Sequence, residues 1–89
     1  MCPLLWVHYN AWSEYLYWQI EDRKTMKRIN DLLKEIQRTP FQGTGSPEAL
    51  RGSLSGKWSR RINQKDRLVY EVTDETIIVL QCKGHYNDK

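Results

Sequence analysis

Residues 57–86 read KWSRRIN, QKD, RLVYEV, TDE, TIIVLQCK and GHY in succession. The three longer runs contain regularly spaced apolar residues, and the two short polar groups between them are typical of turns. We therefore expect three strands in an antiparallel meander. The predicted strands are Lys57–Asn63, Arg67–Val72 and Thr76–Lys83, with turns at 64–66 and 73–75.

The even-numbered positions of these strands are almost all apolar. Successive strand side chains point to opposite faces of a sheet, so this set predicts the core face: Trp58, Ile62, Leu68, Tyr70, Val72, Ile78, Leu80 and Cys82. The odd-numbered positions form the face available for chemistry. They carry Ser59, Arg61, Arg67, Glu71, Gln81 and Lys83, with the apolar Val69, Ile77 and Val79 between them. Arg60 is a charged exception on the even face, and we expect its guanidinium to reach solvent at the sheet edge while its stem packs.

Two helices are predicted before the meander. The first spans Ala11–Ile20, with Asn10 as its N-cap. The second begins after Glu21-Asp22, which offers a cap and a negative charge at its N-terminus. It ends at Thr39-Pro40, because the residue before a proline is disfavoured in the α region. Apolar residues three or four positions apart define its buried stripe: Met26, Ile29, Leu33 and Ile36.

A short apolar run, Leu4–Val7, fits an N-terminal strand that joins the sheet. Together these elements predict an α+β fold, in which two N-terminal helices pack on a mainly antiparallel sheet of four to five strands. With 89 residues, the chain suits a single domain, 1–89, around one core.

Composition favours a cytoplasmic protein. No apolar run approaches the roughly 20 residues of a membrane span, and residues 1–7 are too short and uncharged for a secretory signal. Cys2 and Cys82 belong to no CxxC or His-rich cluster, so we expect both to be reduced and unpaired.

Charge is distributed unevenly along the chain. Residues 1–22 hold three acids and no Lys or Arg, whereas residues 23–61 hold ten Lys or Arg and three acids, a net charge of +7. A basic segment suits a polyanion, and RNA is the obvious one. A solvated helix face explains the same charges equally well.

The segment between the second helix and the meander, residues 40–56, holds four glycines and two prolines. We expect a loop with at most one helical turn near Glu48–Arg51. Gly43-Thr44-Gly45 is not a nucleotide-binding turn, since it lacks the preceding strand and the following helix. Long loops in small domains are more often functional than idle, and this one brings Glu48 beside the basic segment.

Cleavage of RNA by its own 2′-hydroxyl requires a base, cationic groups at the phosphate and an acid for the 5′-oxygen, and it needs no metal or cofactor. Glu48 is a candidate base, and Arg61 and Arg67 are candidate phosphate ligands. His85 is a candidate acid because imidazole donates a proton near neutral pH. Tyr86 is a candidate for stacking on a base or orienting the phosphate.

Each of these residues also has a plainer interpretation. In this interpretation, Glu48 is an ordinary charged loop residue and Arg67 forms an ion pair with Glu71 along one strand face. His85 is then part of a frayed terminus. From spacing alone, both interpretations stay open.

The order of motifs in this sequence closely resembles that in the YoeB toxins of the RelE/ParE superfamily. The matching pieces run from the first helix to the end of the chain: Glu14-Tyr15-Leu16-Tyr17-Trp18-Gln19, Arg38-Thr39-Pro40-Phe41, Gly45-Ser46-Pro47-Glu48-Ala49-Leu50, Leu54-Ser55-Gly56-Lys57-Trp58-Ser59-Arg60-Arg61-Ile62, Asp66-Arg67-Leu68-Val69-Tyr70 and His85-Tyr86. Their joint order and separation are far more specific than any single piece.

Members of this family are ribosome-dependent messenger-RNA endonucleases with a microbial-ribonuclease-like (RelE-like) fold. The resemblance implies that Glu48 is the general base and that Arg67 stabilises the transition state. It also implies that His85 is the general acid and that Tyr86 positions the substrate. By the same resemblance, RNA or phosphate contacts fall to Arg51, Arg61 and Lys57.

The resemblance further implies a set of partners: a YefM-like antitoxin, the ribosome and its mRNA, operator DNA through the antitoxin complex, and a second copy of the chain, but no membrane. The alternative is a non-catalytic superfamily member that binds a protein target such as gyrase or acts in a repressor complex. Retention of all four catalytic candidates favours the nuclease. The chain departs from the family at its N-terminal Cys2-Pro3-Leu4-Leu5, at Val7-His8-Tyr9, and at Asn87-Asp88-Lys89, which follow the His-Tyr pair.

Overall fold

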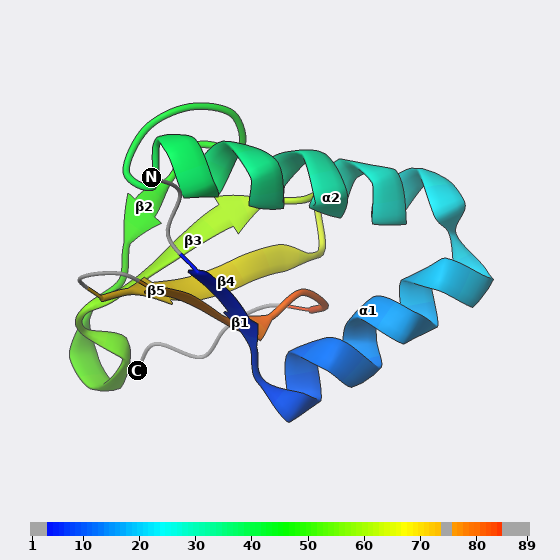
Figure 1. Cartoon of the computed structure of the whole chain (residues 1–89), viewed down its shortest axis with the longest axis horizontal. Coiled ribbons are helices and arrows are strands. Elements are labelled where there is room, and N and C mark those ends of the chain that lie inside the picture. The colour runs from blue at the N-terminus through cyan, green and yellow to red at the C-terminus, as the bar shows by residue number, and fades with distance from the viewer. Residues whose placement is uncertain (1–3, 74–75, 85–89) are drawn as a thin grey trace.

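The computed structural model describes residues 4–73 and 76–84. In chain order its elements are β1 (Leu4–Val7), α1 (Tyr9–Glu21), α2 (Arg23–Arg38), β2 (Glu48–Ala49), the 3-10 helix η1 (Gly52–Leu54), β3 (Lys57–Arg61), β4 (Arg67–Val72) and β5 (Thr76–Gln81). The strands form one sheet in the order β1-β5-β4-β3-β2, with β1 parallel to β5 and the other neighbours antiparallel. Two helices pack on this five-stranded sheet (Figure 1), which confirms the predicted α+β fold.

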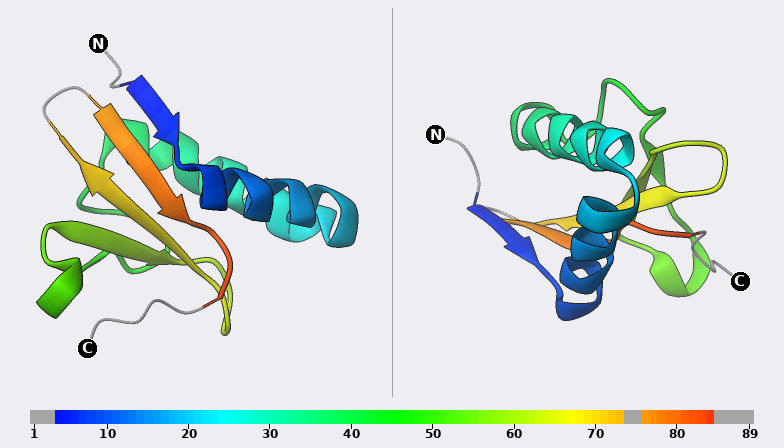
Figure 2. Two further views of the ribbon diagram at one scale, coloured as in Figure 1. Left: turned by 90° about the horizontal axis from the view of Figure 1, so that it is seen from below. Right: turned by 90° about the vertical axis from the view of Figure 1, so that its right-hand side faces the viewer.

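The helix boundaries follow from local caps. His8, rather than Asn10, caps α1, because its Nδ1 accepts a hydrogen bond from the Asn10 N–H at 3.2 Å. Asp22 ends α1 and caps α2, as predicted, and its carboxylate accepts hydrogen bonds from Thr25 and Lys24. The bond from the Thr25 hydroxyl is the main reason that the pKa of Asp22 lies below its ordinary value. Figure 2 shows β1 leading directly into α1, with α2 lying over the sheet. None of the helices within the described ranges is long and apolar enough to cross a membrane.

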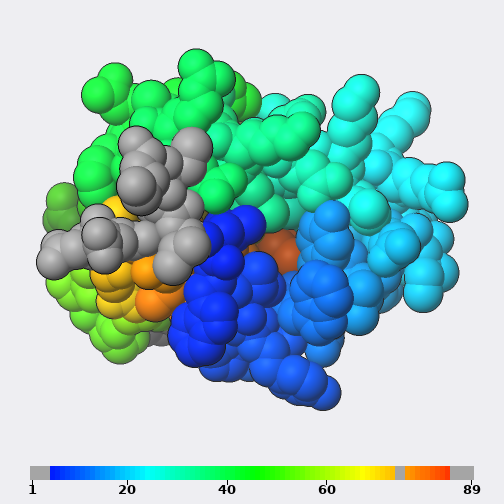
Figure 3. Space-filling model, viewed as in Figure 1, coloured from blue at the N-terminus to red at the C-terminus, as the bar shows by residue number. Residues whose placement is uncertain are grey.

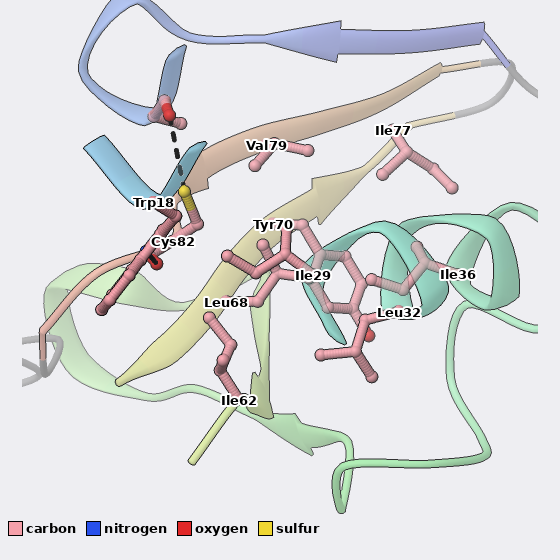
Figure 4. Packing of buried hydrophobic residues seen from close by; sticks show 11 residues of the cluster. Trp18, Ile29, Leu32, Ile36, Ile62, Leu68, Tyr70, Ile77, Val79 and Cys82 are labelled. Carbon is pink, nitrogen blue, oxygen red and sulfur yellow. Dashed lines mark hydrogen bonds between the residues drawn. The ribbon is translucent and has the colours of Figure 1, made fainter. Parts of the chain in front are cut away.

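One hydrophobic core lies between the helices and the sheet (Figure 4). Its buried residues are Ala11, Trp18, Ile29, Leu32, Ile36, Ile62, Leu68, Tyr70, Ile77, Val79 and Cys82. The even-numbered positions of β3 and β4 face this core as predicted, and Trp58 and Val72 are partly buried against it. Cys82 is a free, buried thiol, whereas Cys2 lies outside the described residues.

The predicted face of β5 was wrong for most of the strand. Ile77 and Val79 are buried in the core, whereas Ile78 and Leu80 are only half-buried. The cause is a bulge: Val69 is opposite Gln81, but Tyr70 is opposite Val79, so one extra residue of β5 is inserted between these pairs. An extra residue reverses the inward and outward alternation, which explains why the odd positions before it and Cys82 after it face the core.

Arg60 does not reach solvent, contrary to the sequence-based expectation. Its exposed fraction is 0%, and its guanidinium donates hydrogen bonds into the loop that follows α2. The expectation failed because residues 39–44 fold over the side chain and bring acceptors to it. Only the packing of the stem was as predicted.

Candidate active site

Glu48 lies in a short edge strand, not in the predicted helical turn. Residues Glu48–Ala49 form β2, in which Glu48 is opposite Ser59 of β3 and Ala49 is opposite Trp58. Leu50 then donates its N–H to the Lys57 carbonyl at 2.9 Å, and the chain turns through η1. Pairing with β3 keeps this segment extended and fixes the backbone of Glu48 to the sheet.

Three candidate residues from three neighbouring strands line one pocket of about 240 Å³. Glu48 comes from β2, Arg61 from β3 and Arg67 from β4, and Gly45, Ser46, Pro47 and Ser59 complete the lining. Arg61 and Ser59 alternate with the buried Arg60, so they project from the face opposite the helices. The predicted polar face is therefore where the structure gathers Glu48, Arg61 and Arg67.

The two arginines of this pocket form a cross-strand pair, since Arg61 is directly opposite Arg67. Like charges in this position repel, and a bound anion relieves the repulsion. Arg67 donates through Nη1 to the carbonyl oxygens of Asn63 at 2.7 Å and Asp66 at 3.2 Å. These bonds hold the guanidinium without neutralising it. Glu71 is opposite Lys57, and among the described residues Arg67 and Glu71 form no ion pair.

Two other predicted residues, Arg51 and Lys57, do not line this pocket. Arg51 is exposed immediately before η1, and Lys57 is the half-buried first residue of β3. His85 and Tyr86 lie outside the described residues. The described chain does reach Arg67 at Gly84, whose carbonyl oxygen accepts a hydrogen bond from the Arg67 N–H at 3.0 Å.

Sequence reasoning missed the residues that fix the segment before His85. The carboxylate of Asp66 accepts the Gly84 N–H at 2.7 Å, and that of Glu14 accepts the Cys82 N–H at 2.8 Å. The Trp18 indole donates to the Cys82 carbonyl at 2.8 Å. All three lie within motifs shared with the YoeB toxins, but neither spacing nor periodicity indicates what they bind.

A larger hollow of about 460 Å³ lies between α1, α2 and the first strand. Figure 3 shows it between the blue and cyan helices, with β5 at its floor. Its lining is mostly apolar, including Leu5, Val7, Leu33 and Val79, so it offers no acid and base pair for catalysis. Within residues 4–73 and 76–84, no three His, Cys, Asp or Glu side chains are grouped so as to hold a metal ion.

Comparison with known proteins places the chain in a family. Residues 7–86 match the model of the YoeB-like toxin of bacterial type II toxin–antitoxin systems. The Toxin YoeB of Escherichia coli K12 is 49% identical over 83 residues, which cover 93% of this chain and 98% of that protein.

Two solved structures from Staphylococcus aureus, each 42% identical, cover 97% of this chain and 100% of their own. One is a YoeB dimer, with a TM-score of 0.89, and the other is a heterotetrameric YoeB–YefM toxin–antitoxin complex, with a TM-score of 0.86. These likenesses confirm the fold that the sequence motifs implied. The chain therefore belongs to the family of YoeB-like toxins of bacterial type II toxin–antitoxin systems.

Proposed function

We propose that this toxin is a ribosome-dependent endoribonuclease that cleaves translated mRNA by attack of a 2′-hydroxyl on the adjacent phosphate. The observation that supports this most strongly is the convergence of Glu48, Arg61 and Arg67 on one pocket. The carboxylate can deprotonate a hydroxyl group, and the two guanidinium groups beside it can bind the adjacent phosphate.

In this mechanism Glu48 removes the 2′-proton, and the attacking oxygen forms a bond to phosphorus. Arg67 and Arg61 stabilise the charge that develops on the phosphate oxygens. His85 protonates the departing 5′-oxygen, and Tyr86 positions the substrate. Arg51 and Lys57, exposed or half-exposed near the sheet edge, contact RNA outside the reacting phosphate.

In this proposal the ribosome positions the mRNA, which so small a site does not do alone. The pocket has few groups to hold a flexible mRNA in line for attack, and correct positioning is worth roughly 7 to 11 kcal/mol of a barrier. Cleavage of ribosome-bound mRNA should therefore be much faster than cleavage of free mRNA at the same concentration. Equal rates would contradict ribosome dependence.

We further propose that a YefM-type antitoxin binds and inhibits the toxin in the cytoplasm. In support, the staphylococcal relative forms a heterotetrameric YoeB–YefM toxin–antitoxin complex. An acidic antitoxin segment would cover the basic surface around Arg51, Arg61 and Arg67 and block RNA. By the same likeness, the toxin forms homodimers and reaches operator DNA through the antitoxin complex. Expression without the antitoxin should stop growth, and normal growth with abundant folded toxin would contradict the proposal.

The catalytic roles are tested with programmed ribosomes and modified mRNAs. A 2′-deoxy nucleotide at the scissile position should stop cleavage by the wild type, because it removes the nucleophile. His85→Ala should lose on the order of a hundredfold in rate, and a 5′-thio leaving group should restore much of that loss, because sulfur needs little protonation. The same substrate should not restore Glu48→Ala.

Two control variants separate chemistry from general charge effects. Glu21→Ala removes one negative charge and Arg23→Ala one positive charge from the helices, away from the pocket. Both variant proteins should cleave mRNA at the wild-type rate. Sulfur rescue of Glu48→Ala but not of His85→Ala would reverse the two roles. Growth arrest by a wild type that cleaves no mRNA would instead favour a toxin that binds a protein target.

A further inference from the structure

We propose that Arg60 is a positioning residue for the candidate active site, because its buried guanidinium fixes the loop that forms one wall of the pocket and leads into Glu48. The proposal rests on the proposed function for its catalytic consequence. The loop in question, residues 39–47, connects the end of α2 to β2.

All five N–H donors of Arg60 are used. Nε donates to the Tyr70 hydroxyl at 3.2 Å. Nη1 donates to the Glu35 carboxylate and, at 3.1 Å, to the Thr44 carbonyl oxygen. Nη2 donates to the carbonyl oxygens of Thr39 at 2.5 Å and Gln42 at 2.7 Å. Three of the five acceptors are therefore main-chain oxygens of this one loop.

The two side-chain partners of Arg60 bind the same loop. Glu35 accepts the Thr44 N–H at 2.6 Å and the Thr44 hydroxyl at 3.1 Å. Tyr70 donates its hydroxyl to the Pro40 carbonyl at 2.6 Å, and burial raises the pKa of this phenol, which keeps it protonated as a donor. Arg60, Glu35 and Tyr70 thus form one network that holds the loop at four successive points.

The next residue of the loop joins this network to the pocket. The Gly45 carbonyl accepts the Arg61 N–H at 2.6 Å, and Gly45, Ser46 and Pro47 line the pocket that contains Glu48. Gly45 has φ +87°, and a Cβ there would lie 3.1 Å from the Arg61 carbonyl oxygen, so the close approach favours glycine. Strand β3 therefore holds the loop with Arg60 on one face and presents Arg61 to the pocket on the other.

The chemistry of Arg60 fits positioning better than stability alone. Burying a charge is costly, and a well-packed apolar side chain of similar volume is often neutral or more stabilising. An apolar residue has no planar guanidinium group, which can bind several carbonyl oxygens at once and so fix their positions. The loop contains two glycines, at 43 and 45, so without this fork its backbone has wide freedom.

Two matched hydroxyl deletions test the proposal. Tyr70→Phe removes a hydroxyl that binds both Arg60 and the loop, whereas Tyr15→Phe removes a hydroxyl that binds Asn30 across the two helices at 2.8 Å. Each keeps its ring, so each variant should fold. Arg60→Lys, which keeps the charge but loses the fork, provides a stronger change if it folds.

Two readouts are measured for each variant. The first is hydrogen exchange of the Thr44 and Arg61 amides, which the network protects directly or through Gly45. The second is the cleavage rate at saturating programmed ribosomes, compared with KM. Tyr70→Phe should accelerate exchange at both amides about tenfold and lower kcat by tenfold or more, with KM within twofold, because a small displacement of catalytic groups is costly. Tyr15→Phe should change neither readout.

The outcomes separate this proposal from the proposed function. Equal amide exchange in the two variants would overturn the claim that the network holds the loop, whatever the activity. Faster exchange in Tyr70→Phe with an unchanged kcat would overturn the catalytic consequence. Absence of cleavage by the wild type would overturn the proposed function and the catalytic role of Arg60 together, and exchange alone would then decide whether Arg60 fixes the loop.

Discussion

The carboxylate of Asp66 accepts a hydrogen bond from the backbone N–H of Gly84 at 2.7 Å. The next residue, Arg67, donates its own N–H to the carbonyl of Gly84 at 3.0 Å. Asp66, which precedes β4, and Arg67, its first residue, therefore bind both backbone polar groups of Gly84, near the end of the described chain. We call these two hydrogen bonds the Gly84 clasp. Because His85, the proposed general acid, follows Gly84 in the sequence, the clasp fixes the backbone that precedes it.

Asp66→Ala should lower both stability and cleavage. Asp66 is buried, with 7% of the residue exposed, and loss of a hydrogen bond to a charged group costs about 1.5 to 3 kcal/mol of unfolding free energy. Cleavage on the ribosome should fall about tenfold or more, because the segment before His85 is released. Urea unfolding and single-turnover cleavage measure the two effects.

Two variants control this prediction. Asp66→Asn retains an oxygen acceptor for the Gly84 N–H and should cleave at close to the wild-type rate. Asp22→Ala removes the N-cap of α2, which costs about 1 kcal/mol of stability, but should leave cleavage unchanged at a temperature where it is folded. If Asp22→Ala and Asp66→Ala reduced cleavage equally, the loss would reflect stability and not the Gly84 clasp.

The stabilising effect of Glu35 should depend on pH. The Thr44 N–H is the main cause that holds the pKa of Glu35 below its ordinary value of 4.5, and Arg60 adds to the effect. A carboxyl whose pKa is lower in the folded state stabilises the fold above its unfolded pKa and loses this effect as pH falls through the folded pKa. The stability difference between wild type and Glu35→Gln should thus be largest at neutral pH and shrink below about pH 4.5.

This prediction is checked by urea unfolding of both proteins from pH 7 to pH 3. The difference between wild type and Tyr15→Phe serves as the reference, because that substitution removes no group that titrates in this range. A Glu35→Gln difference that stayed constant down to pH 3 would contradict the proposed charge contribution.

The main elements were predictable because their signals are local. The Asp22 cap and the Thr39-Pro40 boundary each act within a few residues, and the alternation in β4 is carried by its own sequence. The bulge in β5 has no such signal, since it arises from the pairing of Val69 and Tyr70 with residues of the next strand. The inserted residue leaves the apolar composition of the strand unchanged, so parity alone selected the wrong face.

The site was predictable only in part, for a related reason. Parity put Arg61 and Arg67 on one face, but the resemblance was needed to select Glu48 among the acids. The Arg60 side chain binds Glu35, which is 25 positions away in the sequence. The Asp66 side chain binds Gly84, which is 18 positions away. Such long-range partners are fixed by tertiary structure, and the propensity of a single residue does not reveal them.

Arg61 and Arg67 should each contribute to the salt dependence of RNA binding. Each bound phosphate of a single strand contributes a slope of about −0.7 in log K against log salt. Arg61→Ala and Arg67→Ala should therefore each make the slope less steep by about that amount, measured with a 2′-O-methyl RNA that resists cleavage. Arg23→Ala, on α2 away from the pocket, should keep the wild-type slope. An unchanged slope for both pocket variants would contradict phosphate binding at the Arg61–Arg67 pair.

Cys82 should be unreactive in the folded protein. The residue is 1% exposed, and its Sγ donates to the Ala11 carbonyl oxygen at 3.4 Å (Figure 4). Burial, with smaller effects from Glu14 and Asp66, raises its pKa to about 12, so the thiolate is only about one part in ten thousand at pH 8. Because the thiolate is the nucleophile, a Cys2→Ser variant should react with a disulfide reagent only as fast as the protein opens. The unfolded variant in urea should react at once, and rapid modification without loss of structure would show that Cys82 is accessible.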